Sequence, residues 1–319
     1  MKNAMNNDSQ VIVSKKERLH WLDYSKTIGM YLVVLGHVKD NTLLLKGIIY
    51  SFHMPLFFFL SGFLHKLRIG GGGKFCVSLV KQLVIPFFIF NGLTLLTKIK
   101  DIQTNGLIVT VYDFLKDFFE STFLGDLPVG PTWFILSLIW MKIIMFLLLK
   151  IREDFLSLLI IEIIWITALT LYYTLDFPQI PNYFHLGSSL LGFPFYLAGF
   201  LLKLKYKETV AWIKRKRWTI GLIFVFYIIG FLFNGFASLE GCKVGNYILL
   251  MYLTGLCGTL LTIVSTHLLK RPNKWVYVLS CGMIVILCTH GFILNMTINK
   301  FPIFELYSWA WYIYAVISC

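Results

Sequence analysis

Two ionisable residues stand at opposite ends of a short apolar stretch, "KTIGMYLVVLGH", which runs from Lys26 to His37. In a helix the eleven steps between them, at about 100° each, place both side chains within about 20° of one face, roughly 16 Å apart along the axis. Asp23 precedes Lys26 by three residues and can pair with it. A histidine exchanges protons near neutral pH, and a lysine offers a positive charge. Groups at this depth in a membrane face a protein interior or a water-filled cavity and are candidates for function.

Two further histidines are expected at a similar depth on other helices. His53 lies in "YSFHMPLFFFLSGFLH" (50–65) and His290 in "CGMIVILCTHGFI" (281–293). A single buried histidine is often a hydrogen-bonded core residue. Lys26 by itself could extend its amine to the inner membrane–water interface. Three histidines at one level favour a common site. His185 is a weaker candidate, and His20, His65 and His267 are expected at the interface.

The composition predicts the elements that must position these residues. Hydrophobic residues make up 57% of the 319 and charged residues 14%, whereas a soluble domain carries about 25% charge. Apolar runs of about 20 residues are typical of transmembrane helices. We therefore predict an all-α integral membrane protein with a cytosolic tail over residues 1–20 and a single multi-pass domain over 21–319. About ten helices are expected, near 22–38, 47–65, 76–97, 131–149, 155–175, 186–202, 218–236, 245–266, 275–295 and 304–319.

The basic residues predict which way the chain crosses the membrane. With the N-terminus in the cytoplasm, 20 of the 29 Lys and Arg lie in inner segments and seven in outer ones. Positive residues collect in cytoplasmic loops, so this distribution favours an N-terminus inside a cell (inner) membrane. The net charge of +13 then suits the lipid bilayer as a partner. The "KRKR" of 214–217 follows the same rule, and no nucleic-acid partner is expected.

Several other classes of site are not indicated. The six Cys form no C-x-x-C pair, so no metal site is predicted, and no P-loop or dinucleotide fingerprint occurs. "GGGG" (70–73) is expected to be a connector between two spans. Pro55 permits a kink after His53, and Gly62 permits close helix packing. The long outer loop 98–130 is acidic and aromatic, and it could form an amphipathic segment lying over the site.

Together these motifs resemble the integral-membrane acyltransferase-3 family, in the branch related to fucose and other sugar O-acetyltransferases. The resemblance rests on Lys26, ten residues and His37, followed by "SFHMPLFFFLSGFL" (51–64). It continues in "GPTWFILSLIW" (130–140), "LLGFPFYLAGFLL" (190–202) and "YVLSCGMIVILCTH" (277–290), in the family's order. Many members have Arg where Lys26 stands, and a Glu after the "W-S-L" pattern that this chain lacks. An additional hydrolase domain of the kind that some members carry is not expected here.

The resemblance implies an O-acetyltransferase that takes an acetyl or other acyl group from cytosolic acetyl-CoA. The acceptor would be a hydroxyl of a polysaccharide or lipid-linked glycan at the outer face. His37 would act as the general base or as a transient acyl carrier. His53, or a backbone N–H near Pro55, would stabilise the oxyanion, with His290 in the same catalytic group. Lys26, Arg68 and Lys74 would bind the CoA phosphates, while Tyr24 and Trp133 could pack against adenine or sugar.

Two other functions fit part of this pattern. A polysaccharide exporter or flippase would also need ionisable groups in the membrane, but it would leave the glycan unmodified. A non-catalytic subunit of a polysaccharide-assembly complex would not need His37. Release of free CoA and a gain of one acyl mass on the glycan distinguish acyl transfer from both.

Overall fold

The computed structural model describes residues 18–37, 42–66, 71–125, 127, 129–178, 180–269, 271 and 273–300. Nine of the ten predicted segments are helical there, and the tenth, 304–319, lies outside the described residues. In the described part the one β pairing is an isolated bridge between Ser238 and Lys243. The chain is an all-α integral membrane protein, as the composition predicted.

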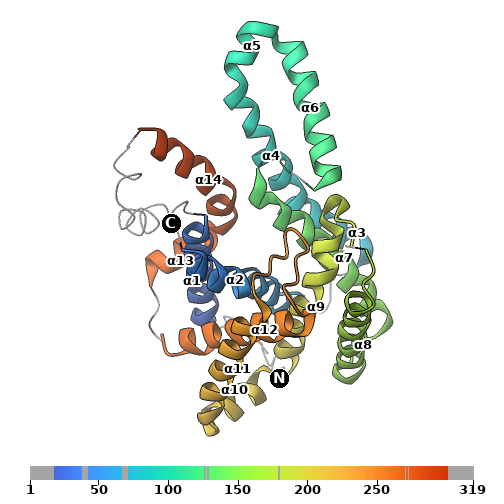
Figure 1. The fold of residues 1–319 in the computed structure, drawn as a ribbon, viewed down its shortest axis with the longest axis vertical. Helices are drawn as coiled ribbons and strands as arrows, with labels where there is room; N and C mark the ends of the chain where they lie inside the picture. The colour runs from blue at the N-terminus through green and yellow to red at the C-terminus, as the bar shows by residue number, and fades with distance from the viewer. Residues whose placement is uncertain are drawn as a thin grey trace, which may run out of the picture.

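The helices follow one another with short connections (Figure 1). They are α1 (His20–Gly36), α2 (Leu43–Phe63), α3 (Gly71–Leu79), η1 (Val80–Val84), α4 (Ile85–Leu93), η2 (Thr94–Lys98), α5 (Ile99–Asn105), α6 (Leu107–Leu124), η3 (Gly130–Thr132), α7 (Trp133–Ile151), α8 (Phe155–Thr174), η4 (Tyr183–His185), α9 (Leu186–Leu204), α10 (Tyr206–Arg215), α11 (Trp218–Asn234), α12 (Ile248–His267), α13 (Lys274–Cys281) and α14 (Met283–Lys300).

The number of spans differs from the predicted ten. Within the described residues, six helical stretches are long and apolar enough to cross a membrane, and up to eight if each of two bent pairs counts as one. The bent pairs are Tyr206–Ile213 with Trp218–Asn234, at 97°, and Lys274–Cys281 with Met283–Ile293, at 79°. α1, with 17 residues, is shorter than these stretches although it packs against α2 and α12. The cytoplasmic position of the N-terminus remains a prediction.

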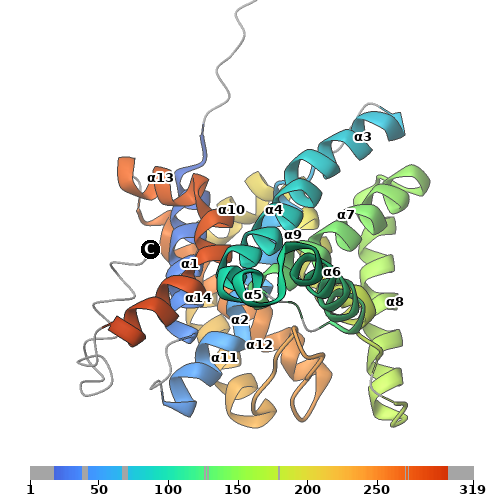
Figure 2. The same cartoon turned by 90° about the horizontal axis from the view of Figure 1, so that it is seen from above.

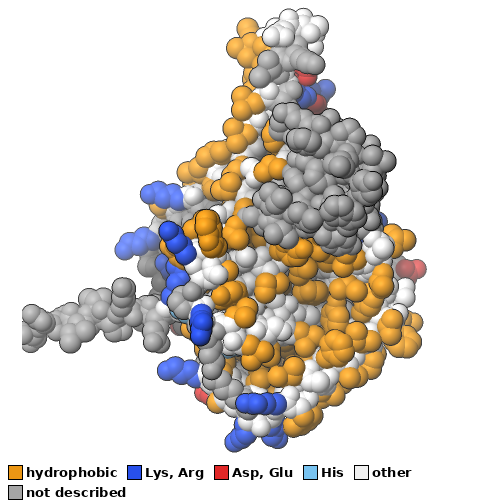
Figure 3. Space-filling model, turned by 90° about the vertical axis from the view of Figure 1, so that its left-hand side faces the viewer, with side chains coloured by type: hydrophobic (Ala, Val, Ile, Leu, Met, Phe, Trp, Pro, Cys, Tyr) orange, Lys and Arg blue, Asp and Glu red, His pale blue; other side chains and the backbone are white. Residues whose placement is uncertain are grey.

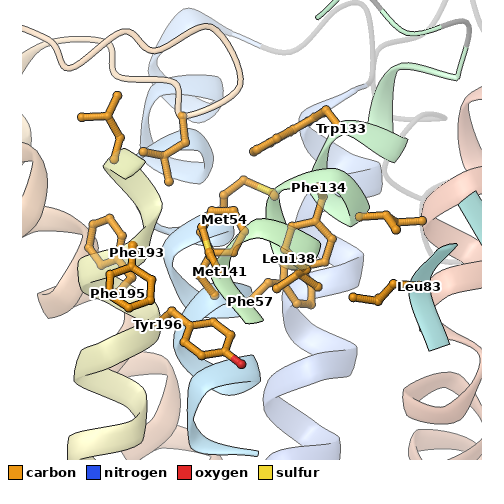
Figure 4. Close-up of a cluster of buried hydrophobic side chains, with 14 of the residues drawn as sticks. Met54, Phe57, Leu83, Trp133, Phe134, Leu138, Met141, Phe193, Phe195 and Tyr196 are labelled. Atoms are coloured by element: carbon orange, nitrogen blue, oxygen red, sulfur yellow. The ribbon is translucent and has the colours of Figure 1, made fainter. Parts of the chain in front are cut away.

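The core of the bundle forms where α2 packs against α9 and α12. Gly62 of α2 and Gly199 of α9 make this possible, because a Cβ on Gly62 would overlap the Tyr196 carbonyl and one on Gly199 the Phe59 carbonyl. The predicted close packing at Gly62 is thereby confirmed. Figure 4 shows side chains from α2, α7 and α9 meeting in this core, where Phe193, Phe195 and Tyr196 are fully buried.

Side-chain caps set the start of several helices. The Thr42 hydroxyl accepts from the Leu45 N–H at 3.2 Å, and the Asp154 carboxylate accepts from the Ser157 N–H at 2.8 Å. The Asn273 side chain accepts from Trp275 and Val276 in the same way. Such caps satisfy N–H groups that have no partner inside the helix. The Ser157 hydrogen bonds hold the pKa of Asp154 below its usual value.

The segment expected to lie over the site is a helical hairpin of α5 and α6. Figure 1 shows this hairpin projecting from the bundle, and Figure 2 shows its two helices side by side. α6 buries Phe114 and Phe118 while its other apolar residues, such as Ile108 and Phe119, are exposed. The segment is therefore helical and two-faced as predicted, but α5 and α6 do not line the cavity described below, and of the described residues of 98–130 only Gly130 does.

The surface also has the character of a membrane protein. Figure 3 shows a face covered largely by apolar side chains, with Lys and Arg gathered towards one edge. Exposed apolar residues are numerous on α4, α8 and α11, including Phe88, Ile164 and Phe224. Large exposed apolar areas of this kind need a non-aqueous neighbour, which the bilayer supplies.

Candidate active site

The structure brings the three predicted histidines to one end of the bundle. The rings of His37, at the end of α1, and His290, on α14, have centroids 4.9 Å apart. Tyr50 lies between His37 and His53, with ring centroids 6.4 Å and 5.0 Å from them. His53 and His290 are buried, and His37 is exposed at the edge of the group.

The helix arrangement explains this meeting. α1 ends at Gly36 and packs against α2, which begins at Leu43, so that Ile49 and Tyr50 lie against Gly36. His53 follows Tyr50 by about one turn of α2. α14 reaches the same level because the α13–α14 pair bends by 79° around Gly282. α1 packs along both arms of this bent pair. The Thr27 hydroxyl, for example, donates to the Val276 carbonyl at 3.2 Å.

The Nδ1 atom of each of the three histidines lies against a backbone carbonyl of its own helix segment. The Nδ1 of His37 lies 2.8 Å from the Val33 carbonyl, that of His53 2.8 Å from Ile49 and that of His290 2.8 Å from Leu287. A carbonyl oxygen only accepts, so this hydrogen-bond network assigns the proton of each neutral ring to Nδ1. Each Nε2 is then left with a lone pair, the state needed to accept a proton from a substrate.

A small cavity opens beside His37. Its volume is about 150 Å³. The described residues that line it are Val33, His37, Tyr50, His53, Met54, Gly130, Pro131, Trp133, Phe134, Ser238, Leu239, Glu240 and Leu287. Among these described residues Glu240 is the one with a formal charge. The cavity is thus mainly apolar, with a few polar groups at fixed positions.

The arrangement does not favour the oxyanion donors expected from the sequence. The one N–H of neutral His53 is used on the Ile49 carbonyl, so its free nitrogen can only accept. Pro55 lies inside α2 and has no N–H, so it frees a carbonyl rather than a donor. Tyr50, which was not predicted from the sequence, lines the cavity and carries a hydroxyl that can donate a hydrogen bond.

At the opposite end of α1, Asp23 binds a different partner from the one expected. Arg18 holds its carboxylate through two nitrogens at 2.7 and 2.9 Å, and the Ser280 hydroxyl donates to it at 2.7 Å. Asp23 therefore pairs with Arg18 rather than with Lys26. The guanidinium also lies 4.0 Å from the centroid of the Tyr277 ring. The Asp23 carboxylate raises the pKa of Arg18 above its usual value.

The predicted phosphate-binding residues are not gathered in one place. Lys26 is half-buried on α1, close to the Asp23 and Cys281 side chains. Lys74 is exposed on α3, which lies away from α1 in both Figures 1 and 2. Arg68 lies outside the described residues. A cavity of about 410 Å³ does open at this end, lined by Arg18, His20, Asp23, Tyr24, Asn273, Lys274, Val276 and Tyr277.

A family model described as an acyltransferase domain matches residues 19–319, almost the whole chain. The chain belongs to the acyltransferase-3 family. No curated protein and no solved structure matches it. The protein is accordingly a membrane acyltransferase, and the predicted family resemblance is confirmed.

Three of the other four histidines of the acyltransferase serve packing and hydrogen bonding, while His20 lines the cavity of about 410 Å³. His65 Nδ1 lies 2.7 Å from the Tyr196 hydroxyl, and His267 Nε2 lies 2.9 Å from the Tyr206 hydroxyl. His185 is buried beside Trp133, with ring centroids 5.9 Å apart, but it does not line the cavity. Within the described part of the acyltransferase, no group of three His, Cys, Asp or Glu is placed to hold a metal ion.

Two cavity residues of the acyltransferase were missed from the sequence. Tyr50 precedes His53 by three residues, so helical spacing places both on one face, and this signal could have identified it. Glu240 lies in the loop between α11 and α12, where spacing in a helix gives no guidance. Its position at the cavity depends on contacts with residues distant in the sequence.

Proposed function

We propose that this acyltransferase moves an acetyl group from cytosolic acetyl-CoA to a hydroxyl of a cell-surface or lipid-linked carbohydrate. The cavity with His37 at its edge carries the proposal. Its lining includes an imidazole whose Nε2 can accept a proton and a tyrosine whose hydroxyl can donate one. The inner cell membrane and the sugar O-acetyltransferase branch are part of this proposal.

His37 acts as the general base. Its Nε2 removes the proton of the acceptor hydroxyl as the oxygen attacks the thioester carbonyl carbon. The C–S bond then breaks, the new ester remains on the acceptor, and the CoA thiolate takes the proton from the imidazolium. Direct transfer of this kind needs no covalent acyl-enzyme, although His37 could carry the acyl group transiently.

Tyr50 and His290 support this chemistry. The Tyr50 hydroxyl donates to the oxyanion that forms on the thioester carbonyl, a role for which neutral His53 has no free N–H. The His290 ring stands against His37 and limits how its imidazole can turn. His53 packs against Tyr50 and orients that ring.

The donor binds from the end of the bundle that holds Arg18. Lys26 neutralises a phosphate of CoA, and Lys74 on α3 and Arg68, which precedes α3 in the sequence, bind other phosphates of this long molecule. Tyr24 lines the cavity at this end and packs against the adenine. Because Lys26 and His37 share one face of α1, the pantetheine arm extends along that helix towards the histidines.

An exporter remains the alternative function. Passage of a glycan requires a continuous path wide enough for whole sugar residues, whereas the cavity at His37 has a volume of about 150 Å³. This size supports reaction at a single hydroxyl over passage of a chain.

The deciding experiment uses purified protein in lipid with acetyl-CoA and a candidate glycan. Free CoA and the mass of the glycan are measured for wild type and for His37→Gln. We expect wild type to release CoA and to add one acetyl group, and His37→Gln to lose about two to four orders of magnitude in rate. His267→Gln is the matched control, because His267 makes the same Nδ1 bond to the Ile263 carbonyl at the other end of the bundle. Near-normal turnover by His37→Gln would contradict the base role, and glycan transport without CoA release would favour the exporter.

A further inference from the structure

A groove lies between α10 and α12, where these two helices and α11 meet at one end of the molecule (Figure 1). Its volume is about 580 Å³, and eight of its twelve described lining residues are aliphatic. The other four are Tyr206, Thr209, Arg217 and His267. We propose that this groove binds one anionic phospholipid, with an acyl chain between α10 and α12 and the headgroup phosphate at Arg217. The site is separate from the proposed reaction, because none of its described residues lines the cavity at His37.

Aromatic rings fix one wall of the groove far from the three histidines of the candidate active site. The Tyr206 hydroxyl donates to His267 Nε2 at 2.9 Å, since the Nδ1 proton of that ring is used on the Ile263 carbonyl. The Trp21 ring stacks on both, with centroids 5.8 Å from Tyr206 and 4.8 Å from His267. Trp21 precedes His37 by sixteen residues, so the groove lies about 24 Å from His37 along α1.

The helix α10 turns its uncharged face towards the groove. Its residues at spacings of three and four line the groove, namely Tyr206, Thr209, Val210 and Ile213. Other positions of α10 carry charged and exposed residues, such as Lys207 and Arg215. A two-faced helix with basic residues lies along a membrane surface and directs its apolar side towards the acyl chains. The groove therefore begins at the level where acyl chains are available.

The surface around the groove needs an apolar neighbour. Leu268 lines the groove and is 77% exposed, and the adjoining helix α11 exposes Leu222 and Val225. Exposed apolar surface of this extent is unfavourable in water, and filling it with hydrocarbon is favourable in proportion to the area removed from water. An acyl chain supplies that hydrocarbon from the bilayer itself.

Arg217 gives the groove its one formal charge among the described lining residues. Its side chain is exposed, and none of the ion pairs in the described part of the chain includes it. Glu208, the acidic residue of α10, pairs with Lys205 at 3.2 Å. The adjacent Lys216 is exposed and adds a second positive charge. Because a guanidinium can bind a phosphate through two N–H groups, the complementary ligand is a negatively charged headgroup.

Two exposed tryptophans mark the level of the headgroups. Trp212 and Trp218 stand on either side of Arg217 in the sequence and are 43% and 65% exposed. Tryptophan collects at the interface between membrane and water, which is where lipid phosphates lie. A single phospholipid thus satisfies both features of the site, with its phosphate at Arg217 and its chain in the groove.

The test locates a lipid probe on the purified full-length protein in phosphatidylcholine vesicles. The probe is phosphatidylglycerol with a photoreactive diazirine in its acyl chain, added as a minor component, and mass spectrometry identifies the labelled residues after illumination. We expect label on α10 and α12 at residues that line the groove, and much less there from phosphatidylcholine with the same diazirine. Label on the exposed face of α8, at Ile160 and Ile164, measures ordinary contact with the bilayer.

Three variants separate a specific site from general attraction. Arg217→Gln should lower groove labelling by phosphatidylglycerol about fivefold, the contribution of one basic residue at an anionic lipid, and leave labelling of α8 unchanged. Val264→Phe, which fills the groove, should lower groove labelling by both probes. Arg215→Gln is the matched control, because it removes an exposed charge from α10 that does not line the groove, and it should have a smaller effect.

Several results would overturn the proposal. Equal groove labelling by the two probes, or an equal loss in Arg215→Gln and Arg217→Gln, would mean that the basic surface attracts lipid without a specific contact. Competition by soluble glycerol phosphate as effective as that by phosphatidylglycerol would indicate a site for free anions, and competition by acetyl-CoA would assign Arg217 to the donor.

A protein occupant is tested with a benzophenone amino acid in place of Thr209. Capture of another segment of this chain, or of a second copy, instead of lipid would also overturn the proposal. Thermal unfolding in phosphatidylcholine shows whether each variant is folded. If Val264→Phe is not, Arg217→Gln decides alone, since it changes an exposed side chain.

Discussion

The ring of His290 stands edge-on to the ring of His37, with centroids 4.9 Å apart and planes inclined by 72°. This contact joins the end of α1 to α14, near opposite ends of the described chain. Each ring holds its Nδ1 proton against a carbonyl of its own helix, so neither can turn without losing that bond. The pair therefore presents the Nε2 of His37 in a restricted orientation.

Replacement of His290 should reduce the rate without removing the base. His290→Phe keeps an aromatic edge against His37 and deletes the ring nitrogens. We expect kcat to fall by less than in His37→Gln, with acetyl-CoA affinity unchanged, because His290 contacts the base rather than the donor. Kinetics of CoA release with saturating glycan measure this, and an effect as large as that of His37→Gln would instead place His290 in direct contact with the substrate.

The pH profile of wild type should fall on the acid side. A protonated His37 cannot accept the hydroxyl proton, so activity is lost as the pH drops through the pKa of this ring in the enzyme. The profile of kcat/KM for the acceptor reports this limb. The small residual activity of His37→Gln should not fall in this way at low pH. The same fall of kcat/KM in that variant would assign the titration to another group.

The Tyr50 hydroxyl can be removed with little change in packing. Tyr50→Phe retains the ring that contacts His53 and deletes the donor, and loss of one oxyanion donor typically costs about 10²–10³ in kcat. Tyr227→Phe is the control. The Tyr227 hydroxyl lies 3.2 Å from that of Ser51, the neighbour of Tyr50 on α2, and Tyr227 does not line the cavity. Equal rates for the two variants would mean that Tyr50 does not stabilise the oxyanion.

The contact between α2 and α9 should be sensitive to a single methyl group. Gly62→Ala or Gly199→Ala places a Cβ against a backbone carbonyl that cannot move alone, and overpacking of this kind costs about 1–3 kcal/mol or more. Gly221→Ala on α11, where nothing lies within 4 Å of the added Cβ, should be neutral or slightly stabilising. Thermal unfolding in lipid or detergent compares them, and equal melting temperatures would refute the close approach.

The charge of Lys26 should matter for the donor more than the shape of its side chain. Lys26→Ala is expected to weaken acetyl-CoA binding, and Lys26→Arg to retain most of it. Lys150→Ala, which removes a charge from the end of α7, is the control. Titration calorimetry with acetyl-CoA gives the three affinities. Unaltered affinity in Lys26→Ala would leave Lys26 as a residue that only anchors α1 at the interface.

Much of this arrangement could be predicted before the structure. Apolar runs are long enough to identify nine helical segments, and helical spacing places Lys26 and His37 on one face of α1. The span count was less predictable, because α1 is short and α13 and α14 bend sharply around Gly282, which hydropathy does not register.

The sequence by itself determined the helical segments, the family resemblance and which histidines are candidates for the site. Each of these depends on residue type and local spacing. Only the tertiary structure decided that Asp23 binds Arg18 and Ser280, that Tyr50 stands between His37 and His53, and that Glu240 reaches the same cavity. These relationships depend on distant segments: Ser280 comes from α13, and Glu240 is held by Asn182 and Ser188. Spacing along one helix constrains directions on that helix, whereas the choice among partners on other helices follows from how the whole bundle packs.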